Sequence, residues 1–206
     1  MLTKQDSAIG DFFDNCAKKG IMNEFDEEER PKLTHCFKQW NIQRGDKILE
    51  PGCGSGRLTI ELAEKVGKTG EVIACDISEE MICSAKKQRA YDNVTYLHSP
   101  VTTIPVNDNY FDTVMCFQVF PHFSERSKAL KEIYRVLKQD GVLWIVHLAS
   151  KETIHKRHRE AGDVVISHNI PEEAEIREVL SQQKFSVEEI LDTSDYYSLK
   201  AIKNSM

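Results

Sequence analysis

Glycines and acids gather around the first strongly apolar run of the chain, Ile48–Leu49. The set consists of Glu50, Gly52, Gly54, Gly56 and, at the end of the next apolar run, Asp76. Because glycine has no side chain, a glycine-rich turn lets the backbone approach a bound ligand closely. The turn and the two acids together predict a site for a cofactor that carries a nucleoside, and therefore an enzyme.

Histidines are the second group of side chains that could take part in catalysis or ligand binding. Five of the seven fall between positions 122 and 168, namely His122, His147, His155, His158 and His168. Ligands of open α/β sheets bind beyond the carboxyl ends of the strands, where His122 and His147 are expected. His122, His147 and His158 are therefore candidate catalytic residues, and with His168 they are candidates to line a substrate pocket as bases or anchors.

A structural role for these histidines stays open, as loop caps, as part of a rim or on a solvated helix. Metal ligation is a further alternative, but no acid or cysteine ligand is evident nearby, so we assign no metal site. The six cysteines form no CxxC pair and show no zinc spacing, and the expected cytoplasmic compartment argues against a disulfide framework. Cys75 and Cys116 lie in apolar runs and are expected in the core.

Composition limits the class of protein. The chain has 206 residues, of which 40% are hydrophobic and 29% charged, as in an ordinary globular domain. Its net charge of −6 argues against nucleic acid as a partner. No apolar run approaches the roughly 20 residues that cross a bilayer, and the first residues lack a signal-peptide core. We expect no membrane partner and a cytoplasmic location.

Short apolar runs alternate with helical patterns along the chain. The expected strands are Ile48–Leu49, Val72–Cys75, Val94–Leu97, Phe111–Cys116, Val142–Val146, Phe185–Leu191 and Tyr196–Ile202. This alternation predicts a doubly wound, Rossmann-like α/β fold with a seven-stranded, mostly parallel sheet and helices on both faces. The last two runs flank Ser194 and Asp195, which predicts an antiparallel C-terminal edge hairpin.

Two serines and one proline mark the expected starts of three helices. Ser78 is positioned to cap the helix that carries Met81, and Ser124 to cap a helix that ends at Gly141. Pro171 is expected in the first turn of a later helix.

We interpret residues 1–206 as a single domain in three parts. Residues 1–44 form a helical lid, in which Phe12 and Phe13 either cover the cofactor or simply pack between helices. Residues 45–149 form the cofactor-binding core. Residues 150–206 hold a substrate-side insertion and the hairpin, and the polarity of the insertion favours a polar or charged small substrate.

The run Glu50–Gly56 resembles the first motif of class I S-adenosylmethionine-dependent methyltransferases. A dinucleotide-binding turn would place glycine where this chain has Arg57, and its pyrophosphate would disfavour Glu50. Phe111–Val114 is similar to the strand-four motif of the family, and Leu137–Leu143 to its approach to strand five. The resemblance covers about residues 8 to 202.

The resemblance implies S-adenosyl-L-methionine as cofactor and assigns roles around it. The glycines would pass under the methionine and ribose, Glu50 would face the amino group, and Asp76 would accept from both ribose hydroxyls, although Asp76 is also placed to cap a helix. Ser99 stands where the family often has an acid. The implied cofactor-binding residues are Glu50, Gly52, Cys53, Gly54, Gly56, Asp76, Ile77, Met81, Ser99, Val101 and Phe117.

The predicted function is methyl transfer from S-adenosylmethionine to a small-molecule acceptor. Phe117–Phe120 does not match the motif that nucleic-acid amino-methyltransferases carry after strand four. The alternatives are a non-catalytic cofactor-binding regulatory module, a protein- or metal-linked methyltransferase and, less favoured, a nicotinamide oxidoreductase. The acceptor, the methylated atom and the oligomeric state stay open.

Overall fold

A computed structural model describes residues 3–21, 23–88 and 90–204. The chain divides into two compact units, Met1–Pro100 and Val101–Met206, which are described in turn. Its seven strands belong to one mixed sheet with helices around it, which confirms the Rossmann-like fold class predicted from the sequence.

The first unit places three parallel strands in the order β3-β2-β1. Its elements are α1 (Lys4–Lys18), α2 (Glu29–Trp40), β1 (Lys47–Pro51), α3 (Arg57–Val66), β2 (Glu71–Asp76), α4 (Glu79–Lys87) and β3 (Val94–His98). All but the first residue of β1 and of β2 are buried, as expected of parallel strands covered on both faces.

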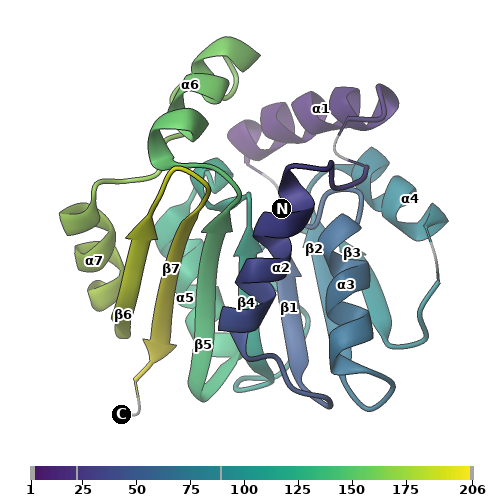
Figure 1. Cartoon of the computed structure of the whole chain (residues 1–206), viewed down its shortest axis with the longest axis vertical. Coiled ribbons are helices and arrows are strands. Elements are labelled where there is room, and N and C mark those ends of the chain that lie inside the picture. The colour runs from purple at the N-terminus through teal and green to yellow at the C-terminus, as the bar shows by residue number, and fades with distance from the viewer. Residues whose placement is uncertain (1–2, 22, 89, 205–206) are drawn as a thin grey trace. The chain divides into compact units, whose positions relative to one another are not determined.

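Helix α3 packs on this sheet through one apolar stripe. Leu58, Leu62, Ala63 and Val66 recur at helical spacing and are all at most 2% exposed. Each large side chain buried in this way contributes roughly 1.5–3 kcal/mol relative to exposure. The stripe fixes the helix that starts directly after the glycine turn (Figure 1).

Helix α1 begins with a capping box between Thr3 and Asp6 and packs near the start of α4. Asp14 accepts hydrogen bonds from the Ser78 hydroxyl, at 2.5 Å, and from the Glu80 amide, at 3.2 Å. A carboxylate is favourable there because the first amides of a helix carry partial positive charge. Gly10 lies against the carbonyl of Ile77, so α1 covers the segment that follows β2.

The second unit orders its strands β4-β5-β7-β6. Its elements are β4 (Phe111–Phe117), the 3-10 helix η1 (Phe120–His122), α5 (Arg126–Val136), β5 (Leu137–His147), α6 (Lys151–Ala161), α7 (Glu173–Gln182), β6 (Phe185–Asp192) and β7 (Tyr197–Lys203). Strands β4 and β5 are parallel, whereas β7 is antiparallel to both β5 and β6. The predicted C-terminal hairpin is thereby confirmed.

Three predictions about helix ends are wrong. The N-cap residue of α5 is Glu125 rather than Ser124, and α5 ends at Val136 rather than at Gly141. It ends there because Leu137 is extended and pairs with Phe111 at the start of β5. Pro171 lies before Glu172, the N-cap residue of α7, and so precedes the first turn.

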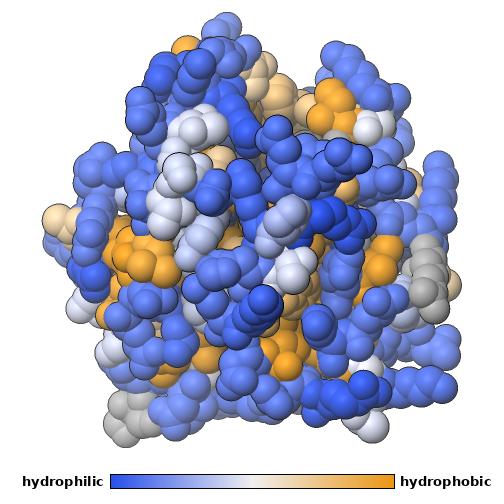
Figure 2. Space-filling view, in the orientation of Figure 1, coloured by the Kyte–Doolittle hydropathy of each residue, from blue (hydrophilic) through white to orange (hydrophobic). Residues whose placement is uncertain are grey.

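Hydrophilic side chains cover most of the face shown in Figure 2, and hydrophobic ones gather there in small patches. In the part of the chain that the structure describes, the exposed large hydrophobic side chains are Ile21, Val164 and Ile166. Among the described residues, no helix is both long and apolar enough to span a membrane.

Candidate functional site

The glycine turn of the first unit has a backbone that other residues adopt only with strain. Gly52, Gly54 and Gly56 have φ of +67°, +54° and +83°. The amide of Gly52 donates to the carbonyl of Cys75 at 2.7 Å, which ties the turn to β2. A Cβ on Gly56 would lie 2.8 Å from the hydroxyl of Tyr96, so both space and φ require glycine there.

Asp76 lies at the carboxyl end of β2 and joins the turn to the start of α4. Its Oδ2 accepts from the Gly54 amide at 2.8 Å, and its Oδ1 from the Ser78 amide at 2.9 Å. Burial raises the pKa of Asp76, while the backbone amides act in the opposite direction. Because each carboxylate oxygen accepts more than one hydrogen bond, the carboxylate can also accept from ligand hydroxyls.

Glu50 is a carboxyl group buried at the end of β1 and only 2% exposed. The Thr59 hydroxyl donates to its Oε2 at 2.6 Å, and Oε1 accepts no hydrogen bond from any residue that the structure describes. Burial raises the pKa of Glu50 to about 8, so the free protein holds it largely protonated at neutral pH. A buried carboxyl with one unused oxygen suits a cationic ligand group.

Arg57 has a structural role that the sequence analysis missed. Its guanidinium binds Glu29 through both terminal nitrogens, at 2.7 and 3.3 Å, and lies 4.4 Å from the centre of the Phe25 ring. The residue that replaces a dinucleotide-type glycine therefore ties the start of α3 to the first residue of α2 and to the segment before it. No local sequence signal marks Glu29 as its partner.

The other cofactor residues expected from the sequence divide between the two units. Ile77, Met81 and Ser99 belong to the first unit, where the Ser99 amide donates to the Asp76 carbonyl at 3.0 Å. Met81 is 1% exposed. Val101 and Phe117 belong to the second unit, where both are buried.

The second unit brings together the histidine cluster, by which we mean His122, His147, His155, His158 and His168. The Nδ1 atoms of His122 and His168 share a hydrogen bond of 2.9 Å. The ring of His122 lies 4.8 Å from that of His158 and 5.1 Å from that of His168, between centroids. These residues come from η1, from α6 and from the segment before α7.

His147, the last residue of β5, is the most deeply buried member of the cluster, at 4% exposed. Burial, together with the nearby His158 and His155, lowers its pKa to about 3. Burial also lowers the pKa of His122, His158 and His168. The cluster is therefore uncharged at neutral pH and offers nitrogen lone pairs rather than cations.

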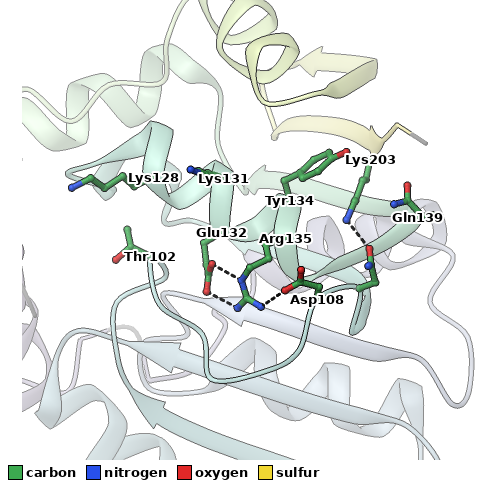
Figure 3. A pocket seen from close by; sticks show the side chains of 10 residues that line it. Thr102, Asp108, Lys128, Lys131, Glu132, Tyr134, Arg135, Gln139 and Lys203 are labelled. Carbon is green, nitrogen blue, oxygen red and sulfur yellow. Dashed lines mark hydrogen bonds and ion pairs between the residues drawn. The ribbon is translucent and has the colours of Figure 1, made fainter. Parts of the chain in front are cut away.

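A polar pocket of about 450 Å³ lies in the same unit, near the start of β5 (Figure 3). Arg135 crosses it between Glu132 and Asp108, with both ion pairs at 2.8 Å. Lys203 donates to Asn109 at 2.8 Å and to the Leu137 carbonyl at 2.7 Å. These cations already have partners, and no residue predicted for the site lines the pocket.

Comparison with known proteins shows that the chain is similar to methyltransferases. A family model described as methyltransferase domain matches residues 49–145. Demethylmenaquinone methyltransferase of Staphylococcus epidermidis is 34% identical over 118 residues, which are 57% of this chain and 49% of that protein. A ubiquinone/menaquinone biosynthesis C-methyltransferase of Yersinia pestis is 31% identical over 139 residues, 66% of this chain and 55% of that protein. The chain thus spans about half the length of these curated relatives.

Solved structures agree on the fold. An S-adenosylmethionine-dependent methyltransferase from Aquifex aeolicus, 25% identical, covers 87% of this chain and 99% of its own, with a TM-score of 0.69. The cyclase SpnF shares the fold at 18% identity and a TM-score of 0.66, covering 80% of this chain and 77% of its own. In sequence over residues 49–145 and in fold, the chain is similar to class I S-adenosylmethionine-dependent methyltransferases.

The first unit fits the methyl donor of this family. Glu50 offers an unused carboxylate oxygen to an ammonium group, and Asp76 retains acceptor capacity for ribose hydroxyls. The positive φ values of the glycines keep side chains out of the turn between the two acids. No feature of this turn opposes a cationic cofactor.

Proposed function

We propose that the protein transfers the methyl group of S-adenosylmethionine to a small-molecule acceptor. The observation that carries this proposal is the pair of buried acids, Glu50 and Asp76, on either side of a turn whose three glycines have positive φ. The sulfonium makes the methyl group electrophilic, so the protein's main task is to hold donor and acceptor in line. Such positioning supplies up to roughly 7–11 kcal/mol of barrier reduction.

Each cofactor residue has a proposed role. Glu50 binds the amino group, Asp76 binds the ribose hydroxyls, and Gly52, Gly54 and Gly56 give the backbone close access. We assign the adenine pocket and its surroundings to the remaining predicted residues. In the first unit these are Cys53, Ile77, Met81 and Ser99, while Val101 and Phe117, in the second unit, stay predictions from the family resemblance.

Helix α1 is proposed as a lid over the donor. Its Asp14 bonds Ser78, and the Ser78 amide bonds Asp76, so the helix is linked to the proposed ribose ligand by two hydrogen bonds. Phe12 and Phe13 pack edge to face, with centroids 5.2 Å apart, and both are half-buried.

Acceptor binding is assigned to the histidine cluster, with His122, His147 and His158 as the candidate catalytic groups. A base is required only when the acceptor must lose a proton. The names of the relatives make quinone precursors the first acceptors to test. A cytoplasmic location and the absence of nucleic-acid partners stay predictions from composition.

Turnover with a panel of acceptors tests the proposal. Purified protein is incubated with radiolabelled methyl donor and demethylated quinones, phenols, amines and thiols, and S-adenosylhomocysteine is measured. We expect acceptor-dependent product that Asp76→Asn reduces at least ten-fold. Tight donor binding without turnover on any acceptor would instead support the regulatory-module alternative.

A further inference from the structure

The histidine cluster has features that methyl transfer alone does not require. His122, His158 and His168 contact one another, and His147 and His155 belong to the same unit, whereas one or two imidazoles would serve as a base. Imidazole nitrogens are also the commonest protein ligands of borderline transition metals. The arrangement of the individual nitrogens decides between these uses.

The closest pair has a spacing that suits a shared metal ion. The Nδ1 atoms of His122 and His168 are 2.9 Å apart. Imidazole nitrogens bind zinc at about 2.0–2.1 Å in a tetrahedral arrangement, so two such ligands lie about 3.3 Å apart. An ion can therefore replace the hydrogen bond between these rings once the two nitrogens separate by about 0.4 Å and turn toward it.

His158 is held as metal-binding histidines usually are. Its Nδ1 donates to the backbone carbonyl of His168, so Nδ1 carries the proton and the lone pair is on Nε2. A backbone acceptor of this kind fixes the tautomer and the ring orientation of metal ligands. His155 differs, because its Nε2 accepts from the Ile170 amide at 3.0 Å and its lone pair is already used.

His147 supplies an independent sign of a missing ligand. It is 96% buried by accessible surface, being 4% exposed, and its Nε2 has no hydrogen-bond partner among the residues that the structure describes. An unpaired buried polar group costs roughly 1–3 kcal/mol. His147 also interacts electrostatically with His122 and His158.

The charged groups around the cluster do not exclude a cation. Arg126 faces His122 and His168, but its guanidinium is anchored to the carbonyls of Pro121 and Asn169. Lys151, Arg159 and Glu172 act on His155, at the side of the cluster that we leave out of the site.

We propose that His122 and His168, joined by His147 and His158, form a binding site for a divalent transition metal such as Zn²⁺. Within the described ranges, no three His, Cys, Asp or Glu side chains already converge as a ligand set, so binding requires a third ring to turn toward the His122–His168 pair. The site does not depend on the proposed methyl transfer, since it involves only the second unit.

Calorimetric titration of Zn²⁺ into the chelator-treated full chain, without methyl donor, tests the site. We expect one ion per chain with micromolar or tighter affinity, and at least ten-fold weaker binding in His122→Gln and in His168→Gln. The matched controls are His155→Gln, whose nitrogen is already used, and His35→Gln on α2, and both should bind as the unmodified chain does. Co²⁺ absorption bands in the visible should appear in the unmodified chain and in both controls only.

Binding that persists unchanged in the His122→Gln/His168→Gln double variant would overturn the proposal, as would the absence of stoichiometric binding. Circular dichroism checks that each variant is folded, and His147→Gln provides a second variant if the double one is not. Donor binding is measured separately on the same samples. A chain that binds S-adenosylmethionine but no Zn²⁺ would reject the metal site alone.

Discussion

Asp14 and Ser78, 64 positions apart in the chain, are joined by a 2.5 Å hydrogen bond. Ser78 also donates its amide to Asp76 and accepts from the Met81 amide. One serine therefore caps α4, orients the proposed ribose ligand and holds α1 over both. This relationship makes the N-terminal helix part of the proposed donor site.

Removing Asp14 should weaken donor binding, although Asp14 is not itself a proposed donor ligand. Asp14→Ala loses the hydrogen bonds to Ser78 and to the Glu80 amide, each worth about 1 kcal/mol or more because the acceptor is charged. We expect about a three- to ten-fold weaker affinity for S-adenosylmethionine and faster proteolysis within α1. Asp11→Ala, an exposed acid on the same helix, is the control. Equal affinities in the two variants would remove α1 from the site.

Donor affinity should depend on pH through Glu50. Its pKa of about 8 in the free protein means that binding a cationic group must release its proton at lower pH. We expect binding on the order of ten-fold weaker at pH 6.5 than at pH 8.5, with proton release detected by calorimetry in buffers of different ionisation enthalpy. In Glu50→Gln, the pH dependence of donor affinity that comes from Glu50 should be lost. Any pH dependence that comes from ionisation of the ligand itself should remain. Identical pH profiles for the two proteins would contradict the assignment.

The same carboxyl should affect the stability of the ligand-free protein. The folded pKa of Glu50 lies above the value of about 4.3 in an unfolded chain, so the folded state binds the proton more tightly. Its stabilising contribution is complete below pH 4.3 and is lost as pH rises toward and through 8. We expect the decrease in Tm between pH 6 and 9 to be smaller in Glu50→Gln, whose amide does not ionise.

Gly56→Ala should destabilise the fold more than a glycine substitution at similar φ. The new methyl would meet the Tyr96 hydroxyl at 2.8 Å, in addition to the left-handed strain of roughly 1–2 kcal/mol. Gly20→Ala, at φ +68° and with its nearest neighbour at 3.5 Å, measures the strain alone. We expect urea unfolding to show at least about 1 kcal/mol of additional loss at Gly56. Partial recovery on adding Tyr96→Phe would assign that loss to the clash.

Most of the fold could be predicted because its signals are local. Apolar runs such as Val72–Cys75 and Phe111–Cys116 became β2 and β4, and the stripe from Leu58 to Val66 became the buried face of α3. The ends of helices were harder to predict. Leu137 continues the helical pattern of α5 in the sequence, but in the structure it pairs with Phe111 in the sheet. That pairing is a tertiary contact, and helical spacing alone does not reveal it.

The candidate site also has one part that local sequence signals indicated and another that depends on long-range contacts. Glu50, the glycine turn and Asp76 lie close to strand ends, so motif and spacing indicated them. The Arg57–Glu29 ion pair and the His122–His168 contact join residues 28 and 46 positions apart, and no short motif encodes them. Histidine composition indicated the cluster, but only the structure distinguishes His155, with its nitrogen in use, from its neighbours.

Calorimetric titration of S-adenosylmethionine into the full chain and into Asp76→Asn tests the central claim most directly. We predict one site with micromolar affinity in the unmodified chain and at least ten-fold weaker binding in the variant, both proteins being folded by circular dichroism. No binding of S-adenosylmethionine or S-adenosylhomocysteine at millimolar concentration, or binding of NAD(H) in their place, would contradict it.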